Sequence, residues 1–218
     1  MNRFTHSWAA LRAAVADLPA QAFAQPSGCA GWLVRDLVCH LIIDAQDVLI
    51  TLATPSDQAP THDAVTYWKI LDSPPTGRDP LDALIVRLAA AYREPSLLSF
   101  HLDDIGAAAG RAAALADGKQ PIATKGQILT TADYLDAYVL EWTLHHLDLV
   151  AHLPELATPP TEGVAYARGL MERIGGFEFP AQIPDIDALL VGTGRRTASA
   201  YEAEALGPLH ERLPLFLA

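Results

Sequence analysis

The sequence predicts a mainly α-helical protein built on a four-helix bundle. Two observations lead to this prediction: apolar residues recur every three or four positions over several long segments, and alternating strands are too few for a real sheet. Half of the 218 residues are hydrophobic, which is enough to bury a sizeable core. We therefore expect an up-and-down bundle over residues 1–154 and a helical or irregular C-terminal extension, residues 155–218, packed on it.

The first two helices are predicted from apolar spacing and from the prolines that follow them. Apolar residues three or four positions apart begin at Phe4 and continue until Pro19, which ends the first helix. A loop rich in glycine and proline then leads to a second helix, expected over residues 33–53 and stopped by Pro55. Asp36 lies in the first turn of this helix, where a carboxylate favours the positive end of the helix dipole.

The middle of the chain is expected to hold a long connection and two further helices. Residues 54–80 contain too many prolines and glycines for a long element, although their apolar and aromatic residues suggest one short helix at 67–71. We expect a helix over residues 79–94, with Pro80 at a first-turn position that tolerates proline. Residues 97–116 are expected to form another.

One more long helix is expected to cross the bundle. Residues 130–133 resemble a capping box, which predicts a helix start there, and the helix continues to Leu153 before Pro154 closes it. Beyond it we expect a shorter helix over residues 161–174 and an irregular tail. The apolar run at 188–191 could form one short strand.

Composition excludes several classes of partner. The net charge of −11 and the isoelectric point near 5.0 oppose binding to nucleic acid or to an anionic membrane surface, because both would repel an acidic protein. The sequence lacks a charge-free apolar run long enough for a membrane span and a signal-peptide pattern at its start. Cys29 and Cys39 are the only cysteines, so we expect reduced thiols in a cytoplasmic protein.

The candidate chemistry comes from polar side chains on segments that otherwise have the pattern of core helices. Glu141 and His145 are four residues apart and therefore share one helix face, whereas His146 lies about 100° further around. His40 lies on the second predicted helix. An unsatisfied buried polar group costs about 1–3 kcal/mol, and one divalent metal would satisfy all three ligands at once. From spacing alone, Glu141 could instead be exposed, and His146 could be the inward residue.

Two histidines and one glutamate are a ligand set suited to zinc with an open fourth position, as in catalytic sites. Asp36 and Asp44 lie one turn to either side of His40, and Asp148 lies three residues beyond His145. These carboxylates could hold the imidazole rings from behind and fix their tautomers. Asp36 could equally serve only the start of its helix.

Two stretches resemble a known family. Residues 28–41, GCAGWLVRDLVCHL, resemble the GW-x-V-R-D-L-x-x-H-L signature of the mycothiol-dependent maleylpyruvate isomerase family, which belongs to the DinB/YfiT-like bundles. Residues 133–135, DYL, followed by residues 141–149, EWTLHHLDL, are similar to the second signature of that family. Together the motifs and their order cover roughly residues 5–153.

The resemblance implies a DinB/YfiT-like four-helix bundle whose metal ligands are His40, Glu141 and His145. It also implies a divalent metal, zinc before others, and a mycothiol-like thiol as cosubstrate. Two features depart from the family pattern. Leu33 stands where members commonly place Ser or Thr to cap the second helix. Residues 155–218 are too short and too poor in strands to form the separate α/β domain of the isomerase, which argues against that specific activity.

The expected function, implied by the resemblance, is a metal-dependent enzyme that activates a low-molecular-weight thiol for isomerisation or S-transfer on a small electrophile. One alternative is hydrolysis by a metal-bound hydroxide at the same site. The other is a non-enzymatic binding module that keeps the bundle. The identity of the electrophile, the choice of divalent metal, the identity of the thiol as mycothiol and the oligomeric state are left open by the sequence.

Two arginines and the two cysteines are further candidates outside this trio. Arg195 and Arg196 follow a Gly-Thr-Gly turn and could bind a substrate carboxylate, although a solvated turn is the better explanation of them. Cys39 is interpreted as a small buried apolar residue. Cys29 lies in a loop without a sequence neighbour that would activate its thiol, so no nucleophilic role is expected.

Overall fold

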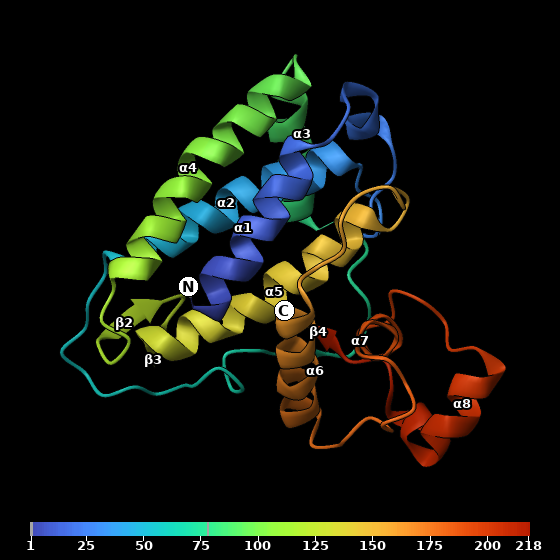
Figure 1. Ribbon diagram of the computed structural model, residues 1–218. Coiled ribbons are helices and arrows are strands. Elements are labelled where there is room, and N and C mark those ends of the chain that lie inside the picture. The colour runs from blue at the N-terminus through green and yellow to red at the C-terminus, as the bar shows by residue number, and fades with distance from the viewer. Residues whose placement is uncertain (1, 78) are drawn as a thin grey trace.

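Four long helices lie side by side and form the body of the molecule (Figure 1). The computed structural model describes residues 2–77 and 79–218. In chain order its elements are α1 (Arg3–Ala16), the 3-10 helix η1 (Ala20–Ala24), α2 (Val34–Leu52), β1 (Ile70–Leu71), α3 (Pro80–Ala91), α4 (Pro95–Leu115), β2 (Pro121–Thr124), β3 (Gln127–Thr130), α5 (Thr131–Val150), α6 (Thr161–Gly175), α7 (Asp185–Gly192), α8 (Ala200–Leu206), the 3-10 helix η2 (Gly207–Arg212) and β4 (Phe216–Leu217). The prediction of a mainly α fold is confirmed.

The bundle consists of α1, α2, α4 and α5. Helices α1 and α2 each pack against both α4 and α5, and α3 lies outside the bundle against α2. Two hydrogen bonds show how α1 and α4 are oriented. Trp8 donates to the carbonyl of Gly106 at 2.8 Å, and Arg12, which comes later in α1, donates to the carbonyl of Asp103, which comes earlier in α4, at 3.2 Å. These two helices are therefore antiparallel.

Helices α2 and α4 run in the same direction, which a simple up-and-down order does not allow. Both end beside the β2–β3 hairpin: the chain after α2 pairs with β2 through Pro55 and Ile122, and β2 itself follows α4 closely. The chain after α2 returns along the bundle through the long connection and α3 before α4 begins. Because this connection is long enough to run back along the bundle, α2 and α4 can point in the same direction, unlike in the up-and-down order expected from the sequence.

Three of the four bundle helices, α1, α2 and α5, begin beside a side chain that accepts a backbone N–H, whereas α4 begins at Pro95 without one. The side chain of Asn2 accepts from the N–H of Thr5 at 2.8 Å, and the hydroxyl of Thr130 accepts from the N–H of Asp133 at 3.1 Å. At α2, where Leu33 has no capping side chain, Asp36 accepts from the N–H of Leu33 at 2.9 Å. Asp36 therefore stabilises the helix start, and α2 begins without a Ser or Thr cap.

Two clusters of buried apolar side chains share α5 between them. The first fills the bundle and includes Trp8 and Trp142, whose rings stack with centroids 3.7 Å apart. The second joins the opposite face of α5, through Leu140 and Leu144, to α6, α7 and α8. Helix α5 contributes side chains to both clusters, so the clusters do not separate residues 1–154 from residues 155–218. The division into these two parts stays a prediction.

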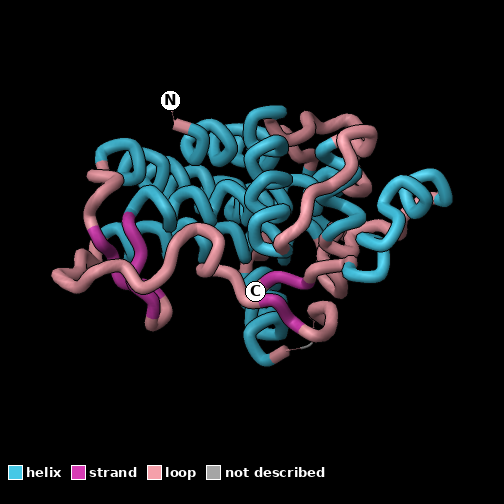
Figure 2. The backbone as a smooth tube through the Cα atoms, turned by 90° about the horizontal axis from the view of Figure 1, so that it is seen from below, coloured by secondary structure: helices cyan, strands magenta, loops and turns pink. Residues whose placement is uncertain are grey.

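Strands are few and short, and they lie at the edges of the helical body (Figure 2). The predicted strand at 188–191 is wrong, because these residues lie within α7, a helix too short for its periodicity to be read from sequence. The predicted short helix at 67–71 is also wrong. Ile70–Leu71 forms a strand that pairs with Phe216–Leu217, which lies far away in the sequence. The β2–β3 hairpin was not predicted. None of the described helices is both long enough and apolar enough to cross a membrane.

Candidate metal centre

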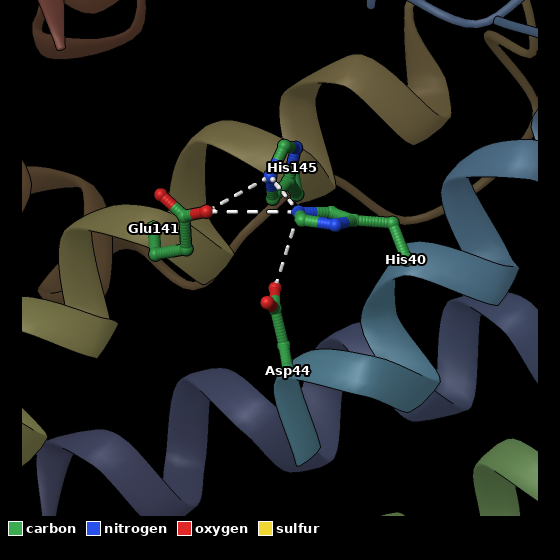
Figure 3. Close-up of side chains that lie close together, drawn as sticks. All are labelled: His40, Asp44, Glu141 and His145. Carbon is green, nitrogen blue, oxygen red and sulfur yellow. Dashed lines mark hydrogen bonds and ion pairs between the residues drawn. The ribbon is translucent and has the colours of Figure 1, made fainter. Parts of the chain in front are cut away.

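Four ligand-type side chains meet between α2 and α5 (Figure 3). His40 and Asp44 come from α2, and Glu141 and His145 come from α5. Each offers one donor atom, and these atoms all lie within 4.8 Å of one another. The structure therefore brings His40, Glu141 and His145 together, as the sequence predicted, and adds Asp44 to them.

The distances within this cluster are short. Nε2 of His40 lies 3.1 Å from Nε2 of His145, and Nε2 of His145 lies 3.1 Å from Oε1 of Glu141. Oε1 of Glu141 is 3.7 Å from Nε2 of His40, and Oδ2 of Asp44 is 3.4 Å from the same nitrogen. Two pairs of residues four apart, one on each helix, supply all four groups, so the geometry is set by how the two helices pack.

The cluster is shielded but not sealed. The side chains of Asp44 and His145 are 8% and 11% exposed, whereas those of His40 and Glu141 are 22% and 25% exposed. The ring of Trp32 lies 5.2 Å from the ring of His40, between centroids. His40 and Glu141 are therefore the side chains of the cluster that solvent partly reaches, whereas Asp44 and His145 lie deeper.

With His145 neutral, lone pairs of the cluster face one another without a proton between them. Nδ1 of His145 lies 3.1 Å from Oδ2 of Asp148, which places a proton on Nδ1 because a carboxylate only accepts. Nε2 of a neutral His145 is then a lone pair facing another acceptor, Glu141. Among the described residues, Oδ2 of Asp44 has no hydrogen-bond partner, although it is buried. Lone pairs that converge in this way fit a cation, and the two-nitrogen, two-oxygen donor set suits zinc.

Without a metal, a proton takes the cation's place, and the pKa directions agree with this. Burial opposes the charged form of His145, but the carboxylate of Glu141 and the hydrogen bond to Asp148 raise the pKa of His145 well above its ordinary value. Burial also opposes the charged form of Glu141, yet the charge of His145 and hydrogen bonds from both imidazoles hold its pKa well below the ordinary value. Burial raises the pKa of Asp44, although the charge of His40 opposes this. A metal must therefore displace a proton from His145, so its affinity falls as the pH falls.

Asp148 lies behind His145, on the side away from the cluster. Its side chain is 1% exposed and also pairs with Arg195, whose Nε and Nη2 each lie 2.8 Å from a carboxylate oxygen. Burial alone would raise the pKa of Asp148, but the charge of Arg195 and the hydrogen bond from His145 hold it far below the ordinary value. Asp148 is therefore a carboxylate that holds the Nδ1 proton of His145.

Cys29 and Gly28 both contact Asp148, which sequence reasoning missed. Sγ of Cys29 donates to Oδ2 of Asp148 at 3.2 Å and lies 3.7 Å from Nδ1 of His145. A side chain at Gly28 would place its Cβ 2.6 Å from Oδ1 of Asp148, and the N–H of Gly28 donates to the Asp148 carbonyl at 2.8 Å. Burial and the charge of Asp148 raise the pKa of Cys29, so the thiol is a hydrogen-bond donor here. The glycine that precedes Cys29 is a signal of close backbone approach.

The remaining sequence candidates lie elsewhere. Asp36 stabilises the start of α2, and its carboxylate makes no hydrogen bond to His40 among the described residues. Arg196 pairs with Asp187 at 2.7 Å and with Glu202 at 2.6 Å, which accounts for it structurally. His146 is turned away from the cluster and donates to the carbonyl of Ala157 at 2.9 Å.

The burial of His146 predicts a pH-dependent loss of stability. Burial lowers the pKa of His146 to about 4, against a weak opposing effect from its bond to Ala157, whereas the unfolded chain has an ordinary histidine pKa near 6.5. The unfolded state then binds the proton first, so stability is complete above about pH 6.5 and falls until about pH 4. Since a tenfold change in proton affinity corresponds to about 1.4 kcal/mol, this histidine accounts for a loss on the order of 3 kcal/mol.

The matched variant is His146→Gln, which keeps a donor for the Ala157 carbonyl but does not titrate. Urea unfolding at several pH values between 4 and 7 measures both proteins. We expect the free energy of unfolding of His146→Gln to fall less steeply with decreasing pH than that of the unmodified protein. Parallel profiles would show that His146 does not contribute to acid sensitivity.

One family model matches this chain. Residues 4–150, well over half of the chain, match the family model described as the mycothiol maleylpyruvate isomerase N-terminal domain. The matched region runs from α1 to the last residue of α5, so it includes all four residues of the cluster and ends before Arg195. Among curated proteins and among solved structures, no match to the chain was found.

Proposed function

Since the chain belongs to the mycothiol maleylpyruvate isomerase N-terminal domain family, we propose that it is a metal-dependent enzyme that activates a low-molecular-weight thiol of the mycothiol type. The observation that carries the proposal is the convergence of His40, Glu141 and His145 on one point, with ligand atoms that one divalent cation would satisfy together. We propose zinc as the metal and a small electrophile as the second substrate. The outcome is isomerisation or S-transfer.

The residues present fit such an ion. Nε2 of His40, Nε2 of His145 and a carboxylate oxygen of Glu141 would hold it, and Asp44 offers a further oxygen within reach. A divalent metal lowers the pKa of a coordinated thiol, so that thiolate is available near neutral pH. Asp148 keeps the Nδ1 proton on His145, which leaves Nε2 free as a ligand. Trp32 and the buried face of the cluster limit the access of water to the site.

The partly exposed side chains of His40 and Glu141 mark the side on which the thiol and the electrophile would enter. Asp148 lies on the opposite side of His145, where Cys29 and Arg195 each donate a hydrogen bond to it. The electrophile therefore has to approach over the His40 and Glu141 side. A thiol bound there would add to a conjugated double bond and be eliminated again after isomerisation, or would displace a leaving group from the electrophile and remain as the conjugate.

Cobalt substitution tests the proposal directly. The purified full-length protein is first assayed for bound divalent metal, then loaded with Co²⁺ and titrated with mycothiol. A sulfur-to-cobalt charge-transfer band is expected in the unmodified protein and is expected to be absent from His145→Ala. Failure to bind zinc or cobalt would favour the non-enzymatic binding module. A bound ion whose spectrum ignores the thiol, together with hydrolysis of an activated ester, would favour the metal-hydroxide hydrolase.

Asp44 is expected to strengthen metal binding. Its buried carboxylate faces the cluster, and the Asp44→Asn variant keeps the shape of the side chain while removing its charge. We expect zinc affinity to fall about 10- to 100-fold, the range seen when groups supporting a metal site are replaced. Competition with a chromogenic chelator measures the affinity.

Asp47→Asn is the matched control for Asp44, because Asp47 lies on the same helix but pairs with Lys125, 3.5 Å away. Its affinity for zinc should match that of the unmodified protein. Equal affinities for Asp44→Asn and Asp47→Asn would mean that Asp44 does not act on the ion.

A further inference from the structure

The turn that follows α7 reaches back to the metal centre through Arg195. The guanidinium of Arg195 donates from Nε to Oδ1 of Asp148 and from Nη2 to Oδ2, both at 2.8 Å. This is a two-pronged pair, in which the planar guanidinium fixes both the position and the plane of the carboxylate. The sequence suggested that Arg195 could bind a substrate carboxylate, but the carboxylate it binds belongs to the protein.

Asp148 passes this constraint on to His145. Its Oδ2 lies 3.1 Å from Nδ1 of His145, and it also accepts from Sγ of Cys29 at 3.2 Å. The side chain is 1% exposed, and Arg195, Cys29 and His145 together make four contacts to its two oxygens. The carboxylate therefore has one orientation, and that orientation keeps a proton on Nδ1 of His145 and turns Nε2 toward His40 and Glu141.

We propose that Arg195 is a positioning residue of the metal centre: by fixing Asp148, it fixes the ring of His145 and so raises the affinity for the ion. The proposal rests on the proposed function, because it requires that the cluster binds a metal. It also assigns a role to the segment after α5, which lies outside the part of the chain that matches the family model. The C-terminal segment then completes the site as well as covering α5.

The neighbouring Arg196 provides an internal control. It belongs to the same turn and is also held by ion pairs, but its partners are Asp187 and Glu202, which lie away from the cluster. Replacing Arg196 disturbs the packing of the C-terminal segment without touching Asp148. A general effect of loosening this segment should therefore appear in Arg196 variants at least as strongly as in Arg195 variants.

The experiment compares zinc affinity, measured by chelator competition, among full-length variants. We expect Arg195→Met to weaken binding about tenfold or more and Asp148→Asn about 10- to 100-fold. Arg195→Lys, which restores the charge but not the two-pronged geometry, should fall between Arg195→Met and the unmodified protein. Arg196→Met should bind zinc as the unmodified protein does.

The double variant decides whether Arg195 acts through Asp148. If it does, Arg195→Met combined with Asp148→Asn binds zinc no more weakly than Asp148→Asn alone. Losses that multiply in the double variant would overturn the proposal, and so would an Arg195→Met variant that binds zinc as tightly as the unmodified protein. Thermal unfolding of each variant verifies that the fold is present, and Arg195→Lys carries the comparison if Arg195→Met does not fold.

A second readout needs no metal. In protein labelled with ¹⁵N-histidine, the Nδ1–H proton of His145 should give a downfield resonance protected from exchange, because it is buried against Asp148. We expect this resonance to be lost or broadened in Arg195→Met and retained in Arg196→Met. If the unmodified protein binds no zinc, the proposed function fails, whereas an unchanged resonance in Arg195→Met contradicts the role of Arg195 itself.

Discussion

Replacing His145 with alanine is expected to lower zinc affinity by at least about 100-fold while leaving the bundle folded. Even residues that only support a metal ligand change affinity about 10- to 100-fold, so removing the ligand itself should exceed that range. His145 is the residue closest to the others in the cluster, with Nε2 3.1 Å from both His40 and Glu141. Its loss leaves one imidazole between two carboxylates.

The fold should survive this change because Asp148 keeps its ion pair with Arg195 when His145 is removed. Chelator competition measures the affinity and thermal unfolding measures the stability of the apoprotein. His152→Ala is the control, because His152 is exposed just beyond the end of α5. A His145→Ala variant that binds zinc as tightly as His152→Ala would remove the metal from the proposed function.

Saturating zinc should also stabilise the unmodified protein and not the His145→Ala variant. An ion that binds only the folded state adds about 4 kcal/mol at a thousandfold excess over its dissociation constant. The same two proteins therefore test binding and its linkage to folding.

The proximity of His40, Glu141 and His145 could be predicted from sequence because two independent features point to these residues. On α5, the four-residue spacing of Glu141 and His145 places them on one helix face. On α2, His40 occurs within the motif that resembles the family signature. The approach of the two helices is not a local property, since more than a hundred residues separate His40 from His145, and only the packing of the bundle brings them to 3.1 Å.

The spacing in the sequence did not predict which nitrogen of His40 Asp44 would face. It stands four residues from His40, the same spacing that selected Glu141 with His145, but it was expected to hold the imidazole from behind. The structure places Asp44 on the side of Nε2, facing the other three donors. Spacing identifies a shared helix face, whereas the ring nitrogen that a carboxylate faces depends on side-chain rotamers.

The partners of Asp148 could not be predicted from the sequence for a different reason. Cys29 lies in the loop before α2 and Arg195 in the turn after α7, and both contact a residue near the end of α5. No periodicity connects three such segments. Arg195 and Arg196 are also equivalent as sequence, yet one contacts Asp148 and the other pairs with Glu202. Only the path of the C-terminal segment separates them.

Replacing Trp8 with alanine is expected to destabilise the fold by about 3–5 kcal/mol, the usual cost of removing a large aromatic side chain from a packed core. Trp8 is 1% exposed, stacks on Trp142 with centroids 3.7 Å apart, and donates its indole N–H to the carbonyl of Gly106 at 2.8 Å. It joins α1 to both α4 and α5. For a chain of this size the melting temperature should fall by roughly 6–20 °C.

Two control variants separate the packing of the Trp8 ring from its hydrogen bond and from the effect of removing a side chain at the surface. Trp8→Phe keeps an aromatic ring against Trp142 but loses the hydrogen bond to Gly106, so it should cost less than Trp8→Ala. Leu115→Ala removes a large apolar side chain that is 87% exposed, and surface changes of this kind stay within about 0.5 kcal/mol. A Trp8→Ala variant as stable as Leu115→Ala would contradict the packing described for the bundle.

The same Trp8→Ala variant also separates stability from metal binding. Trp142, on which Trp8 stacks, directly follows Glu141 in α5, but its ring packs in the bundle core against the rings of Phe4 and Tyr138 as well as Trp8. At a temperature where Trp8→Ala is still folded, its zinc affinity should therefore remain within a few fold of the unmodified protein. A large loss of affinity there would mean that the geometry of the cluster depends on the core packing of α1 against α5 and not only on the local contacts of His145.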